Sequence, residues 1–292
     1  MFVATLVASQ ALRQGDIEEA ADRLAQAGCA PSGRAVIDPG KAADIFFAAD
    51  PAAARTALTE LGEAVDIIVQ PSAIREKALL IADMDSTMIT VECIDELADY
   101  AGIKPQIADI TERAMRGELD FAGALHERVA LLRGLDDAAI DRCRTERVRI
   151  MAGAVALVRT MKARGARTLL VSGGFTRFAD PVAREIGFDR AVANSLNIAD
   201  GALLGTVAAP IVDAARKRAE LESAISGGID RALTLAVGDG ANDIPMIEGA
   251  GLGVAYHAKP KTRAAAAAEI VHGDLSVLLY AQGISSARWV LD

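Results

Sequence analysis

Three short apolar runs, each ending in polar residues, limit the fold of this chain more than any other feature. The runs are residues 78–82, 169–171 and 235–237, and stretches with helical periodicity separate them. Apolar runs of this length, bounded by polar residues, are typical of strands buried in a parallel sheet. Ligands of open α/β sheets bind just beyond the carboxyl ends of the strands. The sequence therefore predicts an α/β fold whose functional residues follow these three runs.

An acidic pair follows the first run. Asp83 and Asp85 are one residue apart. Alternate residues of an extended chain point to the same side, so both carboxylates can reach one ligand while Met84 turns away. Taken alone, such a pair is more often an ordinary acidic loop. The segments that follow the other two runs favour a functional role instead.

Those segments carry groups that suit a phosphate and a cation. Ser172 precedes two glycines, of which Gly173 is the first, so a hydroxyl and backbone without a Cβ atom lie before a predicted helix. The third run leads to Asp239 and Asp243, and Lys217 lies on a predicted helix between the two segments. Each signal is weak alone, because Ser-Gly-Gly and Asp-Gly are common turn sequences and most helical lysines are solvated. Their combination carries the argument.

Composition excludes several other classes of protein. The net charge of -9 over 292 residues gives no basic surface for nucleic acid, and no apolar run approaches the ~18 residues of a membrane span. Cys29, Cys93 and Cys143 are odd in number and widely spaced. They predict free thiols in a reducing compartment, and hence a cytoplasmic protein. The apolar run 2–8 is short and no basic residue precedes it, which favours a strand over a secretory signal.

In this order, the segments resemble the four motifs of the haloacid dehalogenase superfamily of phosphohydrolases. More narrowly, residues 85–96 and 237–246 resemble the phosphoserine phosphatase family within it. The resemblance extends from about Lys77 to about Gly283, most of the chain. One departure is Met84, where the family often has phenylalanine; the residue is apolar in both cases. The resemblance implies a Rossmann-like parallel sheet and a phosphatase that uses Mg²⁺.

The resemblance also implies a specific role for each carboxylate. Asp83 would be the nucleophile that forms an aspartyl phosphate, and Asp85 would be the general acid and then the general base. The implied ligands of Mg²⁺ are the carboxylates of Asp83 and Asp239, the main-chain carbonyl of Asp85, and Asp243 through a bound water. Neighbouring acidic groups would raise the pKa of Asp85, as its acid role requires.

Other residues would hold the phosphoryl group. Ser172, the Gly173 amide and Lys217 match the positions that bind its oxygens, where charge spreads in the transition state. Asn242 would orient this cluster, and Thr87 would support the loop after the first strand.

A second set of residues would recognise the substrate. Free phosphoserine carries an ammonium and a carboxylate besides its phosphate, so its pocket needs one further anion and one further cation. Glu92 and Arg128 match the family positions for these contacts, and a planar guanidinium can bind both carboxylate oxygens. Met115 and Phe121 match apolar positions that shield the site from water. Without the resemblance, surface charge would be the simpler interpretation of Glu92 and Arg128.

The first part of the chain predicts a separate domain, 1–71. Its periodicity gives strand, helix, two strands, helix and strand at 2–8, 16–27, 34–37, 44–48, 51–61 and 65–69. This βαββαβ order is a ferredoxin-like plait. It resembles the ACT-type domains that bind amino acids or mediate association, which implies an amino-acid effector or a homodimer. A domain that merely packs is the alternative.

The catalytic part would occupy 77–292. Helical patterns such as 107–116 and 121–132, without a strong strand, predict a small helical cap inserted at about 92–151. Beyond it, we expect a helix at 176–186, a hairpin around 200–201, an alanine-rich helix at 259–269 and a final segment at 275–282.

Three functions stay open. The first is hydrolysis of free L-phosphoserine to L-serine and phosphate, the last step of serine biosynthesis. The second is a phosphatase or phosphotransferase of the same superfamily that acts on another small phosphate ester, such as phosphohomoserine or a sugar phosphate. The third is an amino-acid sensor or a receiver-like module phosphorylated on aspartate, although a receiver would not need the predicted cap.

Overall fold

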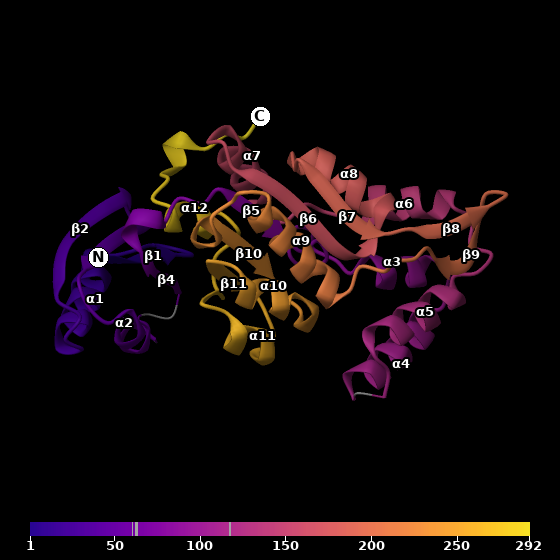
Figure 1. Cartoon of the computed structure of the whole chain (residues 1–292), viewed down its shortest axis with the longest axis horizontal. Coiled ribbons are helices and arrows are strands. Elements are labelled where there is room, and N and C mark those ends of the chain that lie inside the picture. The colour runs from indigo at the N-terminus through magenta and orange to yellow at the C-terminus, as the bar shows by residue number, and fades with distance from the viewer. Residues whose placement is uncertain (60, 62–63, 117) are drawn as a thin grey trace.

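The computed structural model describes residues 1–59, 61, 64–116 and 118–292, and its first part is a four-stranded antiparallel sheet (Figure 1). The strand order is β2-β3-β1-β4. The elements are β1 (Phe2–Ala8), α1 (Gln14–Gln26), β2 (Pro31–Asp38), β3 (Ala42–Phe47), α2 (Pro51–Leu58) and β4 (Val65–Pro71). The predicted βαββαβ order is confirmed. The predicted helix 51–61 includes residue 60, which lies outside the described residues.

Strand β1 is buried on both of its faces. Ala4 and Leu6 pack with the helices of the N-terminal domain, whereas Val7 joins the large apolar core of the rest of the chain. Successive side chains of a strand point to opposite faces, which explains why the run 2–8 is apolar without interruption. An apolar layer therefore joins the N-terminal domain to the catalytic part.

Buried polar groups fix the same junction. The carboxylate of Asp66, on β4, accepts hydrogen bonds from the backbone N–H groups of residues 271–273 at 2.8, 3.1 and 2.6 Å. The side chain of Gln70, also on β4, donates to the carbonyl of Ala281 at 2.8 Å. These bonds give backbone groups of the catalytic part fixed partners on β4.

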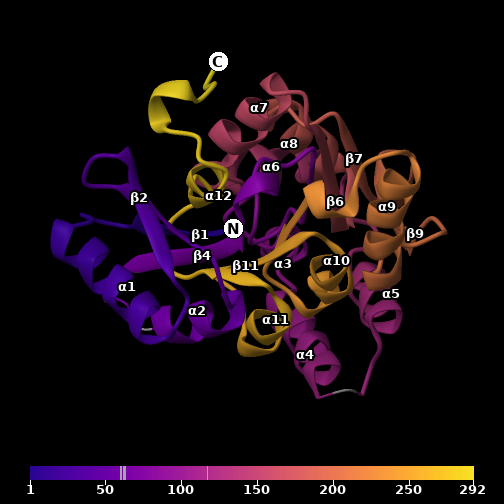
Figure 2. The same cartoon turned by 60° about the vertical axis from the view of Figure 1, so that its left-hand side comes forward.

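The second sheet is parallel, and its six strands follow the order β12-β11-β10-β5-β6-β7 (Figures 1 and 2). The strands are β5 (Leu79–Ala82), β6 (Arg167–Phe175), β7 (Arg190–Asn194), β10 (Thr234–Gly238), β11 (Leu252–Tyr256) and β12 (Ala268–Ile270). The associated helices are α7 (Ala154–Ala163), α8 (Thr176–Ile186), α9 (Ala214–Ser226), α10 (Ile244–Gly249), α11 (Pro260–Ala265) and α12 (Val277–Ala281). The three apolar runs of the sequence form the adjacent strands β10, β5 and β6. Their carboxyl ends therefore meet at one edge, and the predicted parallel α/β core is confirmed.

A helical segment is inserted between β5 and α7, and it lies at the far end of the molecule from the N-terminal domain (Figure 1). Its helices are α3 (Cys93–Tyr100), α4 (Lys104–Met115), α5 (Phe121–Leu131) and α6 (Ala138–Arg147). The predicted small helical cap is thus confirmed. The hairpin of β8 (Leu196–Ala199) and β9 (Ala202–Val207) is also present, but backbone hydrogen bonds join it to residues 134–137 of the cap. The sequence does not predict this attachment.

One predicted helix is wrong in its second half. Residues 259–269 were expected to form a single alanine-rich helix, but α11 ends at Ala265, and β12 pairs in parallel with β11. The helix propensity of alanine is a weak preference that tertiary pairing overrides. Strand β6 also runs further than predicted, through Ser172 to Phe175.

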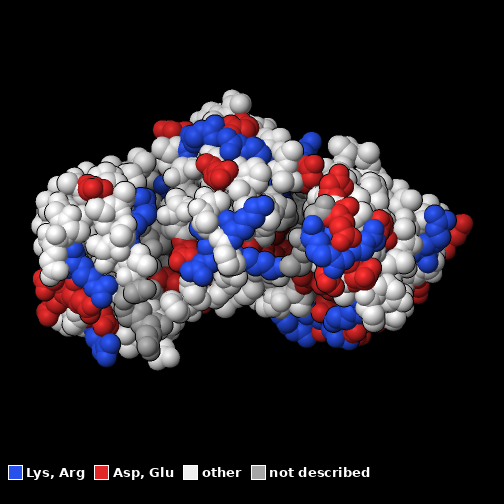
Figure 3. All heavy atoms as spheres, turned by 90° about the horizontal axis from the view of Figure 1, so that it is seen from below, with Lys and Arg blue, Asp and Glu red and all other residues white. Residues whose placement is uncertain are grey.

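The structure also locates the cysteines and the charged side chains. All three cysteines are buried and free. On the face drawn in Figure 3, lysine and arginine atoms are interspersed with acidic atoms and do not gather into one basic patch among the described residues. Within the described part of the chain, none of the helices has both the length and the apolarity that crossing a membrane requires.

Candidate active site

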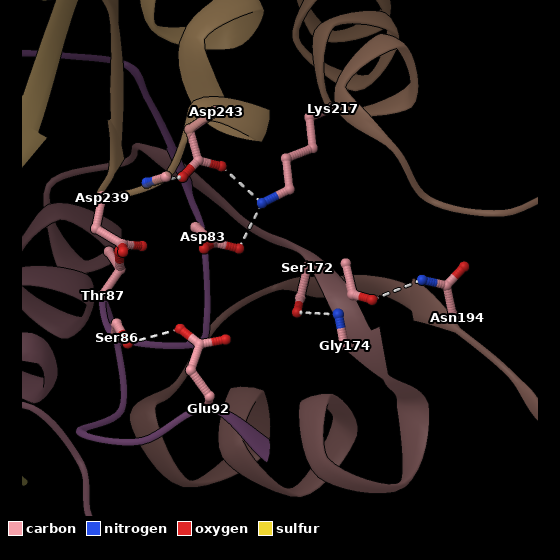
Figure 4. A network of polar contacts seen from close by, with 12 residues as sticks. Asp83, Ser86, Thr87, Glu92, Ser172, Gly174, Asn194, Lys217, Asp239 and Asp243 are labelled. Carbon is pink, nitrogen blue, oxygen red and sulfur yellow. Dashed lines mark hydrogen bonds and ion pairs between the residues drawn. The ribbon is translucent and has the colours of Figure 1, made fainter. Parts of the chain in front are cut away.

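Three carboxylates converge at the carboxyl edge of the parallel sheet (Figure 4). Asp83 follows β5, Asp239 follows the neighbouring strand β10, and Asp243 ends the short turn η3 (Ala241–Asp243). One oxygen from each of them lies within 4.8 Å of the others. The turn is held by the Asp243 carboxylate, which accepts a 3.0 Å hydrogen bond from the N–H of Gly240. The parallel register of β5 and β10 thus brings together residues far apart in the sequence.

A buried ammonium lies against this cluster. Lys217, on α9, is fully buried and donates to Asp83 Oδ1 at 2.5 Å and to Asp243 Oδ1 at 2.6 Å. Burial alone would lower the pKa of Lys217, but Asp243 and Asp83 outweigh it and raise that pKa. The lysine is therefore charged, and it is held in place by the N-terminal turn of α9, where Asp213 caps the helix through the N–H of Arg216.

Among the described residues, Lys217 alone pairs with the three carboxylates, of which Asp83 and Asp243 are buried and Asp239 is partly buried. Burial, and next the Asp243 carboxylate, raise the pKa of Asp83 well above its usual value, against the opposing effect of Lys217. Burial and Asp243 likewise raise the pKa of Asp239 to about 7. Close carboxylates with elevated pKa values favour binding of a further cation, and hard oxygen ligands suit Mg²⁺. The donor set therefore fits a divalent metal ion.

Asp85 lies beside this cluster in a different environment. Its Oδ1 accepts a 3.1 Å hydrogen bond from the N–H of Cys93, at the start of α3. Burial, and next the nearby Glu92, raise the pKa of Asp85 to about 7. The other oxygen, Oδ2, abuts Gly174, where a Cβ atom would lie only 2.7 Å away. A carboxyl group that is protonated near neutral pH can act as a general acid.

The end of β6 provides a second wall of the site. Ser172 is fully buried, and its Oγ accepts a 2.8 Å hydrogen bond from the N–H of Gly174. Because the oxygen accepts this bond, its own hydrogen is available to donate elsewhere. A Cβ atom on Gly173 would lie 3.0 Å from the Phe121 ring, so this glycine permits the cap to approach closely.

The cap contributes the residues expected to read the substrate. Glu92 Oε1 accepts a 2.7 Å hydrogen bond from Ser86 Oγ, and Ser86 has a left-handed backbone with φ of 56°. Burial lowers the pKa of Arg128, while the nearby carboxylates of Asp95, Glu92 and Asp85 oppose this effect. The structure thus brings Arg128 and Glu92 to the side of the site where Asp85 lies.

Three other predicted residues have few or no described contacts with the carboxylates: Thr87, Asn242 and Met115. The hydroxyl of Thr87 donates to Asp239 Oδ1 at 3.2 Å, which agrees with a supporting role for the first loop. Asn242 lies within η3 with its Oδ1 turned toward Gly240, and among the described residues its amide forms no hydrogen bond to the carboxylates. Met115 ends α4, but its side chain lies outside what the structure describes.

Sequence reasoning missed three residues of this site. Gly174 and Ser86 adjoin predicted residues, so their neighbours in the sequence could have indicated them. Asn194, at the end of β7, is almost fully buried and donates to the carbonyl of Gly173 at 2.8 Å. Its signal was weaker, because a single asparagine before a predicted hairpin is ordinary turn chemistry.

The haloacid dehalogenase-like hydrolase family matches this chain over residues 80–248. The chain therefore belongs to that family. The matched range begins in β5 and ends in α10, so it contains the three converging carboxylates, Lys217 and the whole cap.

Two phosphoserine phosphatases and one solved structure are among the proteins that this chain resembles. A phosphoserine phosphatase of Streptomyces coelicolor is 45% identical over 236 residues, which are 79% of this chain and 57% of that protein. A phosphoserine phosphatase of Polaromonas is 44% identical over 224 residues, which are 75% of this chain and 95% of that protein. The crystal structure of a haloacid dehalogenase family hydrolase from Salmonella enterica serovar Typhi has a similar fold, with a TM-score of 0.83. The two sequences are 27% identical, and the superposition covers 96% of this chain and 98% of that one. The chain thus spans a little over half the length of the Streptomyces relative.

Proposed function

We propose that this protein is a phosphatase that hydrolyses free L-phosphoserine to L-serine and phosphate, the last step of serine biosynthesis. The observation that carries the proposal is the cluster of Asp83, Asp239, Asp243 and Lys217, with Asp85 beside it and Glu92 and Arg128 on the same side. The names of the two phosphoserine phosphatases that the chain resembles support the same substrate.

The chemistry would run in two steps on the residues of this chain. An oxygen of Asp83 bonds to phosphorus while the bond from phosphorus to the serine oxygen breaks, and Asp85 gives its proton to that oxygen. Asp85 then takes a proton from water as the water oxygen attacks the aspartyl phosphate. The bond from phosphorus to Asp83 breaks, which releases phosphate and restores the Asp83 carboxylate and the protonated Asp85. The pKa of about 7 at Asp85 suits a group that must act as acid and then base.

Mg²⁺ is the metal ion that we assign to this site. Asp83 and Asp239 would hold it with carboxylate oxygens, together with the main-chain carbonyl of Asp85, and Asp243 would act through a water bound to the metal. A bound divalent cation offsets the repulsion between an anionic nucleophile and an anionic ester. Ser172, the Gly173 amide and Lys217 would hold the phosphoryl oxygens, because they can donate hydrogen bonds to them.

Substrate choice would rest on the cap. The guanidinium of Arg128 would bind the substrate carboxylate through both oxygens, and Glu92 would bind the ammonium, with Ser86 holding the glutamate in place. Phe121, in contact range of Gly173, would keep water from the reacting group. Met115 is assigned to the same apolar lining on the resemblance alone.

The substitution Arg128→Ala tests this assignment. We expect kcat/KM for phosphoserine to fall about 100-fold, because a site built for a carboxylate loses its main partner. Turnover of p-nitrophenyl phosphate, which lacks the amino acid group, should change less than about threefold. Arg142→Ala is the matched control, since Arg142 is an exposed cap arginine paired only loosely with Asp136 at 3.8 Å. Equal losses on both substrates would contradict the role of Arg128.

A panel of esters separates phosphoserine from the other substrates of this class. Steady-state assays should compare L-phosphoserine with phosphohomoserine and a sugar phosphate, each with and without Mg²⁺. We expect phosphoserine to have the highest kcat/KM. A higher value for another ester would move the protein to a different branch of the same family while keeping the chemistry.

The N-terminal domain and the cellular location belong to the same proposal. A hollow of about 750 Å³ lies between this domain and the catalytic part, and its walls include Arg55 and the ion pair of Arg263 with Glu269. Such a mixture of charges would suit an amino-acid effector, which calorimetric titration with L-serine would detect. Sedimentation would test for a homodimer.

The free thiols support a cytoplasmic location.

A further inference from the structure

Asn194 connects two separate segments of the candidate active site. It is the last residue of β7 and only 1% exposed. Its Nδ2 donates to the carbonyl of Gly173 at 2.8 Å, and its Oδ1 accepts from the N–H of Val212 at 2.7 Å. Figure 4 shows the side chain pointing toward the end of β6 from outside the carboxylate cluster. Both ends of this one amide are therefore engaged.

The first bond fixes a peptide plane beside the reacting group. The carbonyl of Gly173 and the N–H of Gly174 belong to the same planar unit, so they point in opposite directions. Holding the carbonyl toward Asn194 therefore directs the Gly174 N–H toward Ser172, whose Oγ accepts it at 2.8 Å. Two glycines in sequence would otherwise allow this unit to rotate freely. The hydroxyl of Ser172 is thereby left as a donor toward the site.

The second bond fixes the approach to the lysine helix. Val212 immediately precedes Asp213, the residue that caps α9. Helix α9 then carries Lys217 to Asp83 and Asp243. The N–H of Val212 is buried, and a buried donor without a partner destabilises the conformation that buries it. Asn194 thus sets the position of the helix start relative to the end of β6.

We propose that Asn194 is a positioning residue that aligns Ser172 and Gly173 with Lys217 to form one binding site for the phosphoryl group. It touches neither the substrate nor the metal, and it acts through the two backbone groups that it binds. The inference rests on the proposed function, because it requires a phosphoryl group between these segments. It predicts that losing Asn194 weakens phosphate binding for every substrate alike.

The test uses the full chain with Mg²⁺ present and inorganic phosphate as the probe. In Asn194→Leu the volume stays similar while both hydrogen bonds are lost. We expect its dissociation constant for phosphate to rise about 10- to 100-fold. Its kcat/KM should fall by the same factor for phosphoserine and p-nitrophenyl phosphate, whereas the Mg²⁺ activation constant should stay within about twofold. Asn197→Ala is the matched control, because Asn197 is a half-buried asparagine on β8 whose side chain bonds only to Thr206 among the described residues.

Two further measurements keep the result decisive. Asn194→Ser, which leaves room for a water to reach both backbone groups, replaces the leucine variant if that variant does not fold. Calorimetry on the unsubstituted protein shows whether phosphate binds at all, and failure there would contradict the proposed function itself. If the unsubstituted protein binds phosphate and the Asn194 variants bind it equally well, the positioning role is wrong. A loss of phosphate and Mg²⁺ affinity in parallel would also overturn it, because that pattern indicates general loosening of the site.

Discussion

Two buried carboxylates of this molecule have opposite surroundings. Asp66, at the junction of the N-terminal domain, is 3% exposed and accepts three backbone hydrogen bonds through both oxygens. Asp83, at the candidate active site, is 5% exposed, and its side chain bonds to Lys217, which it shares with Asp243. Fixed amide groups surround the first anion, whereas other anions surround the second.

The difference separates a structural carboxylate from a functional one. A buried anion with a full set of fixed donors is satisfied by the fold, and it joins the segments that supply the donors. A group of buried anions with too few cations raises the pKa values of its members, as Asp83 and Asp239 illustrate. Such a group is satisfied only when a metal ion or a substrate arrives. Burial alone would not distinguish these two sites.

The substitution Asp83→Asn should have the largest effect on activity. The amide cannot form the aspartyl phosphate, so we expect kcat for phosphoserine to fall by at least about 10³-fold. Asp66→Asn is the comparison, because it also neutralises a buried carboxylate but should leave kcat unchanged within about twofold. Phosphate release from homogeneous preparations measures both. Undiminished turnover by the Asp83 variant would remove the proposed nucleophile and the mechanism with it.

Removal of metal should have the next largest effect, and its size should depend on pH. A chelator should abolish activity, and added Mg²⁺ should restore it. Mg²⁺ binds the ionised carboxylates, so its stabilising effect should be larger at about pH 8 than at about pH 5, where protons compete. Melting temperatures with and without Mg²⁺ at the two pH values measure this. An equal rise at both would contradict the cluster as the metal site.

The sign of the pH effect follows from the raised pKa values. Asp85 and Asp239 titrate near pH 7 in the folded protein, but near pH 4 in an unfolded chain. Between about pH 4 and pH 7 the folded state holds more protons, so this cluster lowers the free energy of unfolding as pH rises. Without metal, these two groups should therefore lower the melting temperature as the pH rises.

Much of the fold could be predicted because its signals are local. Apolar runs and helical periodicity indicated the βαββαβ domain, the parallel core and the helical insertion. The alanine-rich segment 259–269 shows the limit, because β12 exists only through its pairing with β11. The attachment of the β8–β9 hairpin to the cap could not be predicted either. It depends on hydrogen bonds between residues 134–137 and 201–203, which are far apart in sequence.

The residues of the candidate site also divide into those with a local sequence signal and those that depend on tertiary contacts. The residues assigned to chemistry each follow a recognisable strand or match a family motif, so the sequence could name them. Asn194 acts through the backbone of Gly173 and Val212, and Ser86 acts through Glu92. Such supporting contacts depend on where two segments meet in space. A single sequence gives no distance between them, so the contacts that these residues make could not be predicted.

The substitution Asp66→Asn should have the smallest effect on activity and a clear one on stability. An amide places a donor where the carboxylate accepts from residues 271–273, so at least one of these N–H groups loses its partner. We expect the free energy of unfolding to fall by about 1–3 kcal/mol. Asp22→Asn, on the exposed face of α1, removes the same charge and should change stability by less than about 0.5 kcal/mol. Denaturant titrations measure both. Equal stability of the two variants would show that the backbone donors around Asp66 do not fix the junction.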